Sequence, residues 1–263
     1  MRPNALSVSV ADSLAMRVEN SFIGVDGVGE RTERKLWEQG VTHWDDFDAD
    51  LLGSKTGAAV ADYIDEGTTR LDAGDARFFA DSLPDSEHWR LYENFRTSTA
   101  FFDIETTGLD AASSVVTTVS VTVDGETTTL VRGQDLTGEN LRALFDDAAL
   151  LVSFNGKRFD VPFLEHHFDV ALADRPHVDL MYLAKRVGLS GGLKAIEPEL
   201  GIHRDDDVDG REAVRLWRQY ENHGDDAALD RLVAYNRDDT EHLETILDEV
   251  AGRVRAETFD PYL

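Results

Sequence analysis

Cysteine and long hydrophobic runs are both missing from the chain. None of the 263 residues is a cysteine, so disulfide bonds and thiolate metal sites are both excluded. No segment approaches the roughly 18 consecutive apolar residues of a membrane-spanning helix, and the N-terminus lacks the apolar core of a signal peptide. With a hydrophobic content of 41%, these absences predict a soluble, cytoplasmic protein with a sizeable core.

Positive charge is also scarce. Arginine and lysine total 26 against 52 acidic residues, which gives a formal net charge of −26, and only five of the basic residues are lysine. The acids are spread along the whole chain, as in proteins of salt-loving organisms, and an ordinary acidic protein is the alternative. At molar salt the Debye length falls to about 3 Å, so the self-repulsion is screened. Such acidity normally disfavours nucleic acid as a partner, because phosphate is anionic.

Residues 21–66 are expected to form a small all-α domain. A glycine-rich turn at Gly27 and Gly29 precedes a helix-like stretch that Gly40 ends. The apolar spacing resembles a helix-hairpin-helix motif, with a weaker second copy around Gly53. A tandem pair of hairpins is therefore the expected arrangement.

In the helix-hairpin-helix family, turn amides at a helix start hold a DNA phosphate without reading the base sequence. The resemblance therefore implies DNA binding through Gly27, Gly29 and Arg31. This copy departs from the family pattern, because Asp26 stands where proline is common and acids such as Glu33 crowd the basic residues. A small packing domain with glycine-capped helices is the alternative.

The rest of the chain divides into an N-terminal segment (1–20), a helical connector (67–97), an α/β domain (98–256) and a C-terminal tail (257–263). Within the α/β domain, the sequence predicts strands over 100–105, 115–123, 127–133 and 150–154, and a helix over 139–147. The remainder reads as helical, with room for a short strand near 177–181. This order of elements predicts an α/β fold with a mixed sheet.

Two carboxylates interrupt the first apolar strand. Asp103 and Glu105 are two residues apart, so they point to one face while Phe102 and Ile104 point to the other. Two acids this close repel each other unless something neutralises them, and oxygen ligands suit Mg²⁺ or Mn²⁺. A strand with one solvated face is the alternative for this pair taken alone.

Two later stretches strengthen the metal-site interpretation. Asn155, Phe159 and Asp160 follow the fourth expected strand, and Tyr235 and Asp239 lie four apart in a late helical pattern, which places them on one helix face. In order and spacing, the set resembles the DnaQ-like, or DEDD, 3′–5′ exonucleases of the ribonuclease H-like fold, tyrosine subclass. The D-x-E, N-x₃-F-D and Y-x₃-D motifs of that family all have a match in this chain, and the sequence around them is most similar to the YprB-like branch.

The resemblance implies a two-metal-ion nuclease with Mg²⁺ or Mn²⁺ as cofactors. Asp103 would bridge both ions, Glu105 and Asp239 would complete one site, and Asp160 would serve the other. Tyr235 would orient the attacking water, because a phenol with a pKa near 10 is a poor base at neutral pH.

Further residues are expected to contact the substrate. By the same resemblance, Thr106, Thr107 and Gly108 shape the loop under the terminal nucleotide. Asn155 holds either the nucleotide or the turn, and Lys157 either touches a backbone phosphate or is a solvated charge. Asp179, near a short strand, is expected to cap a helix or support the site.

Three functions are compatible with this pattern. The leading one is a metal-dependent 3′–5′ exonuclease acting on DNA, tethered by the helix-hairpin-helix region. The second is an RNA-processing exonuclease or a structure-specific endonuclease. The third is a non-catalytic DNA-binding adaptor, which the intact acidic residues argue against, because acids that repel one another have no structural reason to persist together.

Overall fold

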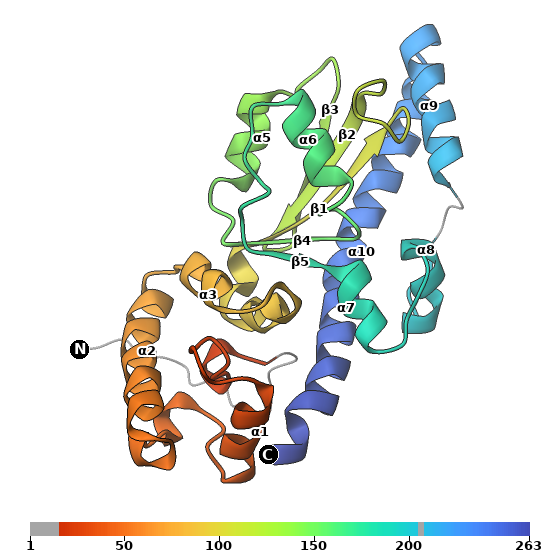
Figure 1. The fold of residues 1–263 in the computed structure, drawn as a ribbon. Coiled ribbons are helices and arrows are strands. Elements are labelled where there is room, and N and C mark those ends of the chain that lie inside the picture. The colour runs from red at the N-terminus through yellow and green to blue at the C-terminus, as the bar shows by residue number, and fades with distance from the viewer. Residues whose placement is uncertain (1–15, 205–207) are drawn as a thin grey trace, which may run out of the picture.

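The computed structural model describes residues 16–204 and 208–263 (Figure 1). Most of the expected N-terminal segment, residues 1–15, lies outside the described residues. Figure 1 shows the sheet in one half of the molecule and the N-terminal helices in the other half, with the long C-terminal helix running past both. Within the described residues, no helix is long and apolar enough to cross a membrane.

A five-stranded mixed sheet forms the centre of the C-terminal region, as predicted. Its order is β3-β2-β1-β4-β5, in which β1, β2 and β3 are antiparallel and β4 and β5 run parallel to β1. The strands are β1 (Thr99–Thr106), β2 (Val116–Val123), β3 (Glu126–Val131), β4 (Leu150–Ser153) and β5 (His177–Asp179). Their β-branched and aromatic content favours extended backbone. Asp124 and Gly125, both at positive φ (49° and 77°), form the tight turn between β2 and β3.

Helices cover both faces of this sheet. They are α5 (Gly138–Phe145), α6 (Asp160–His167), α7 (Leu180–Arg186), α8 (Leu193–Ile196), α9 (Gly210–His223) and α10 (Asp226–Thr258). Phe102 and Ile104 of β1 pack in one apolar cluster with side chains of α5 and α6. Phe101 packs in a second cluster with α10, which crosses the opposite face (Figure 1). The alternation along β1 therefore turns Asp103 and Glu105 towards α10.

The N-terminal region is helical throughout its described residues. Its α-helices are α1 (Glu30–Glu38), α2 (Ser54–Asp72), α3 (Ala76–Ser82) and α4 (Tyr92–Phe95), joined by short 3₁₀ turns. The expected boundary at residue 66 is wrong, because α2 continues past it. Gly67 does not end the helix but lets it approach Trp44 closely, since a β-carbon there would stand 2.8 Å from the indole ring. The expected boundary at residue 256 likewise falls inside α10.

The two regions share one apolar core. Trp37 of α1 meets Phe259, just beyond α10, with ring centroids 5.1 Å apart in an edge-to-face arrangement. A single cluster of buried side chains includes residues of the N-terminal helices, the connector and α10. The connector therefore does not separate two independent cores.

A buried ion network reinforces this junction. Arg90, 1% exposed, pairs with Glu33 of α1 at 2.9 Å and with Glu87 at 2.7 Å. Arg186 of α7 also reaches Glu87, at 2.7 Å. The expectation that Glu33 crowds the basic residues of α1 is wrong, because its carboxylate points into the core, where it accepts hydrogen bonds from Ser21 and from the Phe22 amide.

Candidate active site

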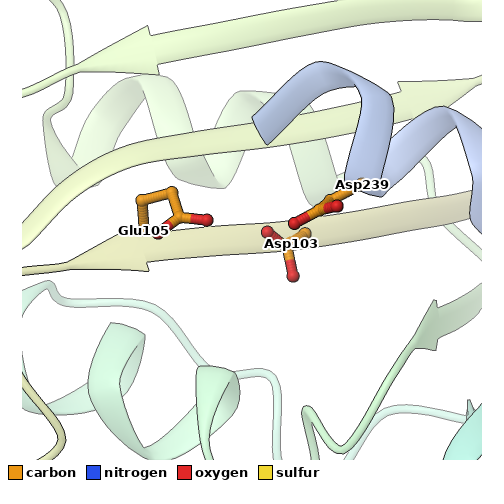
Figure 2. A group of neighbouring side chains, drawn as sticks. All are labelled: Asp103, Glu105 and Asp239. Carbon is orange, nitrogen blue, oxygen red and sulfur yellow. The ribbon is translucent and has the colours of Figure 1, made fainter. Parts of the chain in front are cut away.

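Three carboxylates converge between β1 and α10. Asp103 and Glu105 project from one face of β1, and Asp239 projects from the facing side of α10 (Figure 2). One carboxylate oxygen from each lies within 4.8 Å of the others. This is the grouping that the D-x-E and Y-x₃-D patterns predicted.

Asp160 supplies a fourth carboxylate. It is the first residue of α6 and is only 4% exposed. Main-chain hydrogen bonds from Ile104 and from its own amide reach the carboxylate. Its charge raises the pKa of both Asp103 and Glu105, although burial raises those pKa values more. The four predicted acids therefore form one electrostatic unit.

Burial is the main cause of the raised pKa values of these acids. It raises the pKa of Asp160 to about 7, and it raises the pKa of Asp103 and Glu105 well above their ordinary values. The neighbouring Asp239 carboxylate is the next largest cause for both residues of β1. Full ionisation of the group thus requires added positive charge.

Asn236 orients Asp103, although none of the sequence motifs includes it. Its amide nitrogen donates to Asp103 Oδ2 at 2.8 Å, and its amide oxygen accepts from Ser120 Oγ at 2.9 Å. Ser120 in turn lies 2.8 Å from Thr129 Oγ1 of β3. Asn236 is fully buried. Its only sequence signal is its position directly after Tyr235.

Two cations from the segment before α9 also approach the acids. Arg204 pairs with Asp239 and, at 2.5 Å, with Glu197. Lys194 lies 5.0 Å from the ring centroid of Tyr235, and no hydrogen-bond partner for its buried ammonium is found among the described residues. Neither cation belongs to one of the three sequence motifs, so the sequence analysis did not select them.

Tyr235 lies beside Asp239, as its position four residues earlier on α10 predicts. Its hydroxyl hydrogen-bonds with the Asp239 carboxylate. Burial, followed by the charges of Asp239 and Glu105, raises the pKa of this phenol far above its ordinary value. The hydroxyl therefore stays protonated at neutral pH and can donate a hydrogen bond.

The loop after β1 is internally braced. Thr106 Oγ1 donates to Gly108 O at 2.7 Å, and Thr107 accepts from the Val115 amide at 3.0 Å. A β-carbon at Gly108 would stand 2.6 Å from Ser114 Oγ. The loop forms part of a cleft of about 660 Å³ that Glu105, Leu109, Phe159 and two arginines of α9, Arg211 and Arg218, also line.

Asp179 organises the turn that precedes Asp160. It caps α7 by accepting from the Met181 amide at 3.1 Å, which confirms the predicted capping role. It also accepts from the Asn155 amide at 2.8 Å and from the Lys157 amide at 3.3 Å. Asn155 has a φ of 64°, so this residue shapes the turn through its backbone. The Lys157 ammonium pairs with Asp85 of the connector at 3.1 Å.

The residues expected to bind DNA lie elsewhere. Gly27 (φ 89°) and Gly29 form the turn before α1, and Arg31 is in the first turn of that helix. All three are exposed. Figure 1 shows α1 in the half of the molecule that does not contain the sheet. The structure thus does not bring them together with the four acids.

Residues 100–251, more than half of the chain, match the family profile of the RNase_H superfamily. The chain belongs to that superfamily. This match agrees with the mixed sheet described above and with the ribonuclease H-like fold predicted from the sequence. A search of curated proteins gave no match.

Several solved structures are similar in fold. The family B DNA polymerase of the hyperthermophilic archaeon Pyrobaculum calidifontis is 18% identical, with a TM-score of 0.44; the match covers 59% of this chain and only 27% of the polymerase. NrnC of Brucella melitensis with bound Mg²⁺ is 19% identical, with a TM-score of 0.35, over 63% of this chain and 89% of NrnC. A protein described as the apo form of a nuclease is 21% identical, with a TM-score of 0.45, over 64% and 79%. At identities this low the likeness concerns the fold alone.

Proposed function

We propose that this RNase_H superfamily protein is a metal-dependent 3′–5′ exonuclease that hydrolyses phosphodiester bonds, with DNA as the favoured substrate. One observation carries the proposal: four buried or half-buried carboxylates from β1, α6 and α10 lie together beside an open cleft, and oxygens of Asp103, Glu105 and Asp239 come within 4.8 Å of one another. Buried acids in this number are costly for folding alone. Their retention is explained by a function that needs them ionised together.

The donor set fits divalent cations. It consists of carboxylate oxygens, which Mg²⁺ and Mn²⁺ prefer, and it lacks sufficient positive charge of its own. We assign Asp103, Glu105 and Asp239 to one ion and Asp103 with Asp160 to a second. Two bound cations would make water nucleophilic and stabilise the oxygen that leaves the phosphorus.

The protein's own groups would orient the reactants. Asn236 holds the Asp103 carboxylate in one rotamer, and the protonated Tyr235 hydroxyl can donate to the attacking water. The cleft beside Glu105 would receive the 3′-terminal nucleotide, with Thr106, Thr107 and Gly108 as its braced wall. Arg211 and Arg218 also line this cleft and place positive charge there, where a strongly acidic chain otherwise repels phosphate.

The N-terminal region would hold the nucleic acid at a second point. Gly27, Gly29 and Arg31 are exposed around the start of α1, and a helix N-terminus suits a phosphate group. Because this contact reads no bases, it would add affinity without sequence preference. The identification of this region as helix-hairpin-helix rests on the sequence pattern.

Cleavage of matched strands tests the proposal. Single-stranded DNA and RNA of one sequence, labelled at the 5′ end, are incubated in molar KCl with Mg²⁺ or Mn²⁺. We expect a ladder that shortens from the 3′ end, on DNA more than on RNA, and that EDTA, a blocked 3′ end or Asp103→Asn abolishes. Asp146→Asn, an exposed acid after α5, is the matched control and should behave as wild type.

The alternatives give different products. A faster ladder on RNA would assign the RNA-processing exonuclease, and internal fragments insensitive to the 3′ block would assign the endonuclease. Folded protein that binds Mn²⁺ and DNA without cleaving any strand would contradict the nuclease and leave the non-catalytic adaptor.

A further inference from the structure

A second cavity lies at the junction of the connector and the RNase_H superfamily domain. It has a volume of about 340 Å³, which is within the roughly 300–1,000 Å³ range of small-molecule sites. Its wall on one side is the connector, with Ser86 and Trp89, and on the other side β5 and α7, with Val178, Tyr182 and Leu183. The connector lies outside residues 100–251, so the superfamily match does not account for this cavity.

The cavity and the candidate active site share one loop. The Asp179 carboxylate lines the cavity and holds the amides of Asn155 and Lys157. The same loop leads into Asp160, the first residue of α6. Asp179 is also close enough to Asp160 for its charge to act on that carboxyl, so the cavity adjoins the loop that presents one of the four acids.

The side chains at the cavity suit a nucleobase and its phosphate. Tyr182 is 44% exposed, one of few large apolar side chains that reach solvent in the described part of the chain. Lys185 lies 5.1 Å from the Tyr182 ring centroid, and Lys157 and Arg186 are among the residues that line the cavity. Two of only five lysines in a chain of net charge −26 thus stand at this one place.

The acids at the cavity are compatible with the binding of a nucleobase and its phosphate. Asp179 is 6% exposed, and both of its oxygens accept main-chain amides. The Asp85 side chain is 83% exposed, so its pair with Lys157 is a surface ion pair, of a kind that contributes little to stability. Lys157 can exchange this partner for a phosphate at little cost.

We propose that this cavity binds an unpaired base of the substrate strand, upstream of the bond to be cut. Tyr182 stacks on the base, and Lys157 leaves Asp85 to bind the adjoining phosphate. The substrate class is then single-stranded nucleic acid of more than one nucleotide, since a paired base cannot enter. The proposal rests on the proposed nuclease function and adds a specificity site to it.

Binding measured without cleavage tests the cavity separately from catalysis. The dissociation constant of a short 5′-fluorescein single-stranded oligodeoxynucleotide is measured by anisotropy at fixed KCl, in EDTA and in Ca²⁺. Stacking on one aromatic ring corresponds to about a five-fold effect or more. We therefore expect Tyr182→Ala to raise the dissociation constant at least about five-fold, and Tyr182→Phe, which keeps the ring, to stay near wild type.

Two further comparisons identify what is bound. Tyr182→Ala should have no effect on a strand of the same length built from abasic sites, because only the phosphates remain. Asp85→Asn should tighten binding of both strands, because it releases Lys157. Three results would overturn the proposal: equal dissociation constants for wild type and Tyr182→Ala, no binding by wild type in EDTA or in Ca²⁺, or an equally large effect of Tyr182→Ala on the abasic strand. An effect of Tyr182→Ala on the binding of a free mononucleotide alone would also overturn it.

The outcomes for the two proposals are distinct. Binding with the expected Tyr182 dependence, but no cleavage in Mg²⁺ or Mn²⁺, would contradict the proposed nuclease function and support the base-binding cavity. Cleavage without any Tyr182 dependence of binding would do the reverse.

Discussion

Asn236 donates a hydrogen bond to Asp103 at 2.8 Å and is itself fixed by Ser120 of the neighbouring strand. This chain of contacts ties the central acid of the site to β2. The carboxylate of Asp103 is thus presented in one orientation before any ligand arrives. Supporting contacts of this kind typically change metal affinity or activity by about 10–100-fold when lost.

Asn236→Ala should therefore lower the affinity for Mn²⁺ and the cleavage rate, each by about 10–100-fold. The loss should be larger than that of Asn222→Ala, an exposed residue of α9 whose amide only meets its own helix. Metal affinity is measured by calorimetry and cleavage by the labelled-strand assay. Wild-type metal affinity in Asn236→Ala would show that Asp103 is oriented by other means.

Arg204 neutralises Asp239 in the absence of metal. Arg204→Gln leaves a buried carboxylate with one partner fewer, which should reduce the free energy of unfolding by about 1–3 kcal/mol in EDTA. Saturating Mg²⁺ should reduce the difference in unfolding free energy between wild type and Arg204→Gln, because a bound cation would then neutralise Asp239. Arg253→Gln, at an exposed site of α10, is the control. An equal loss with and without Mg²⁺ would mean that Arg204 is purely structural.

The raised pKa of Asp160 predicts a pH dependence of stability. Its pKa is about 7 in the folded protein and 3.8 when unperturbed, so between these values the folded state binds the extra proton. Stability from this group is then constant below about pH 4 and falls as pH rises towards 7. The resulting loss in the free energy of unfolding is at most about 4 kcal/mol.

A difference measurement isolates this group. Asp160→Asn should be more stable than wild type at pH 7 and above in EDTA, and the difference should vanish near pH 4. The comparison is needed because His177, with a pKa lowered to about 3 by burial, destabilises the protein as pH falls from 6.5. Denaturant unfolding across this range provides the data; a difference independent of pH would contradict the assignment.

Period-two alternation was enough to predict which face of β1 carries the acids. Asp103 and Glu105 lie where the alternation of Phe102 and Ile104 places them, and Asp239 follows from helix spacing with Tyr235. The mixed sheet was predictable for the same reason, because each strand is a short apolar run bounded by turn residues.

Tertiary contacts were not predictable in this way. Asn236 became important only because α10 crosses β2, and Arg204 only because the segment before α9 folds back onto Asp239. Glu33 was misread because its partner, Arg90, is distant in sequence. The boundary at residue 66 failed because α2 continues to Asp72.

The edge-to-face contact of Trp37 with Phe259 predicts that the two regions unfold together. Phe259→Ala removes a ring from the shared core and should cost about 3–5 kcal/mol. Calorimetry should show one transition for wild type and one, shifted to lower temperature, for the variant. Two transitions of which only one shifts would mean that the N-terminal helices and the RNase_H superfamily domain fold independently.

Tyr235 tests whether the hydroxyl beside Asp239 acts in the reaction or only in packing. Tyr235→Phe keeps the ring against Lys194 and Arg204 and removes only the oxygen. If the hydroxyl positions the attacking water, the loss of one donor should lower kcat by about 10²-fold or more, with little change in KM or Mn²⁺ affinity. Tyr220→Phe, which removes a hydroxyl bonded to Gln134, is the matched control and should keep its kcat. A proportional loss of Mn²⁺ affinity would instead place the Tyr235 hydroxyl among the groups that hold Asp239, because that carboxylate is its hydrogen-bond partner.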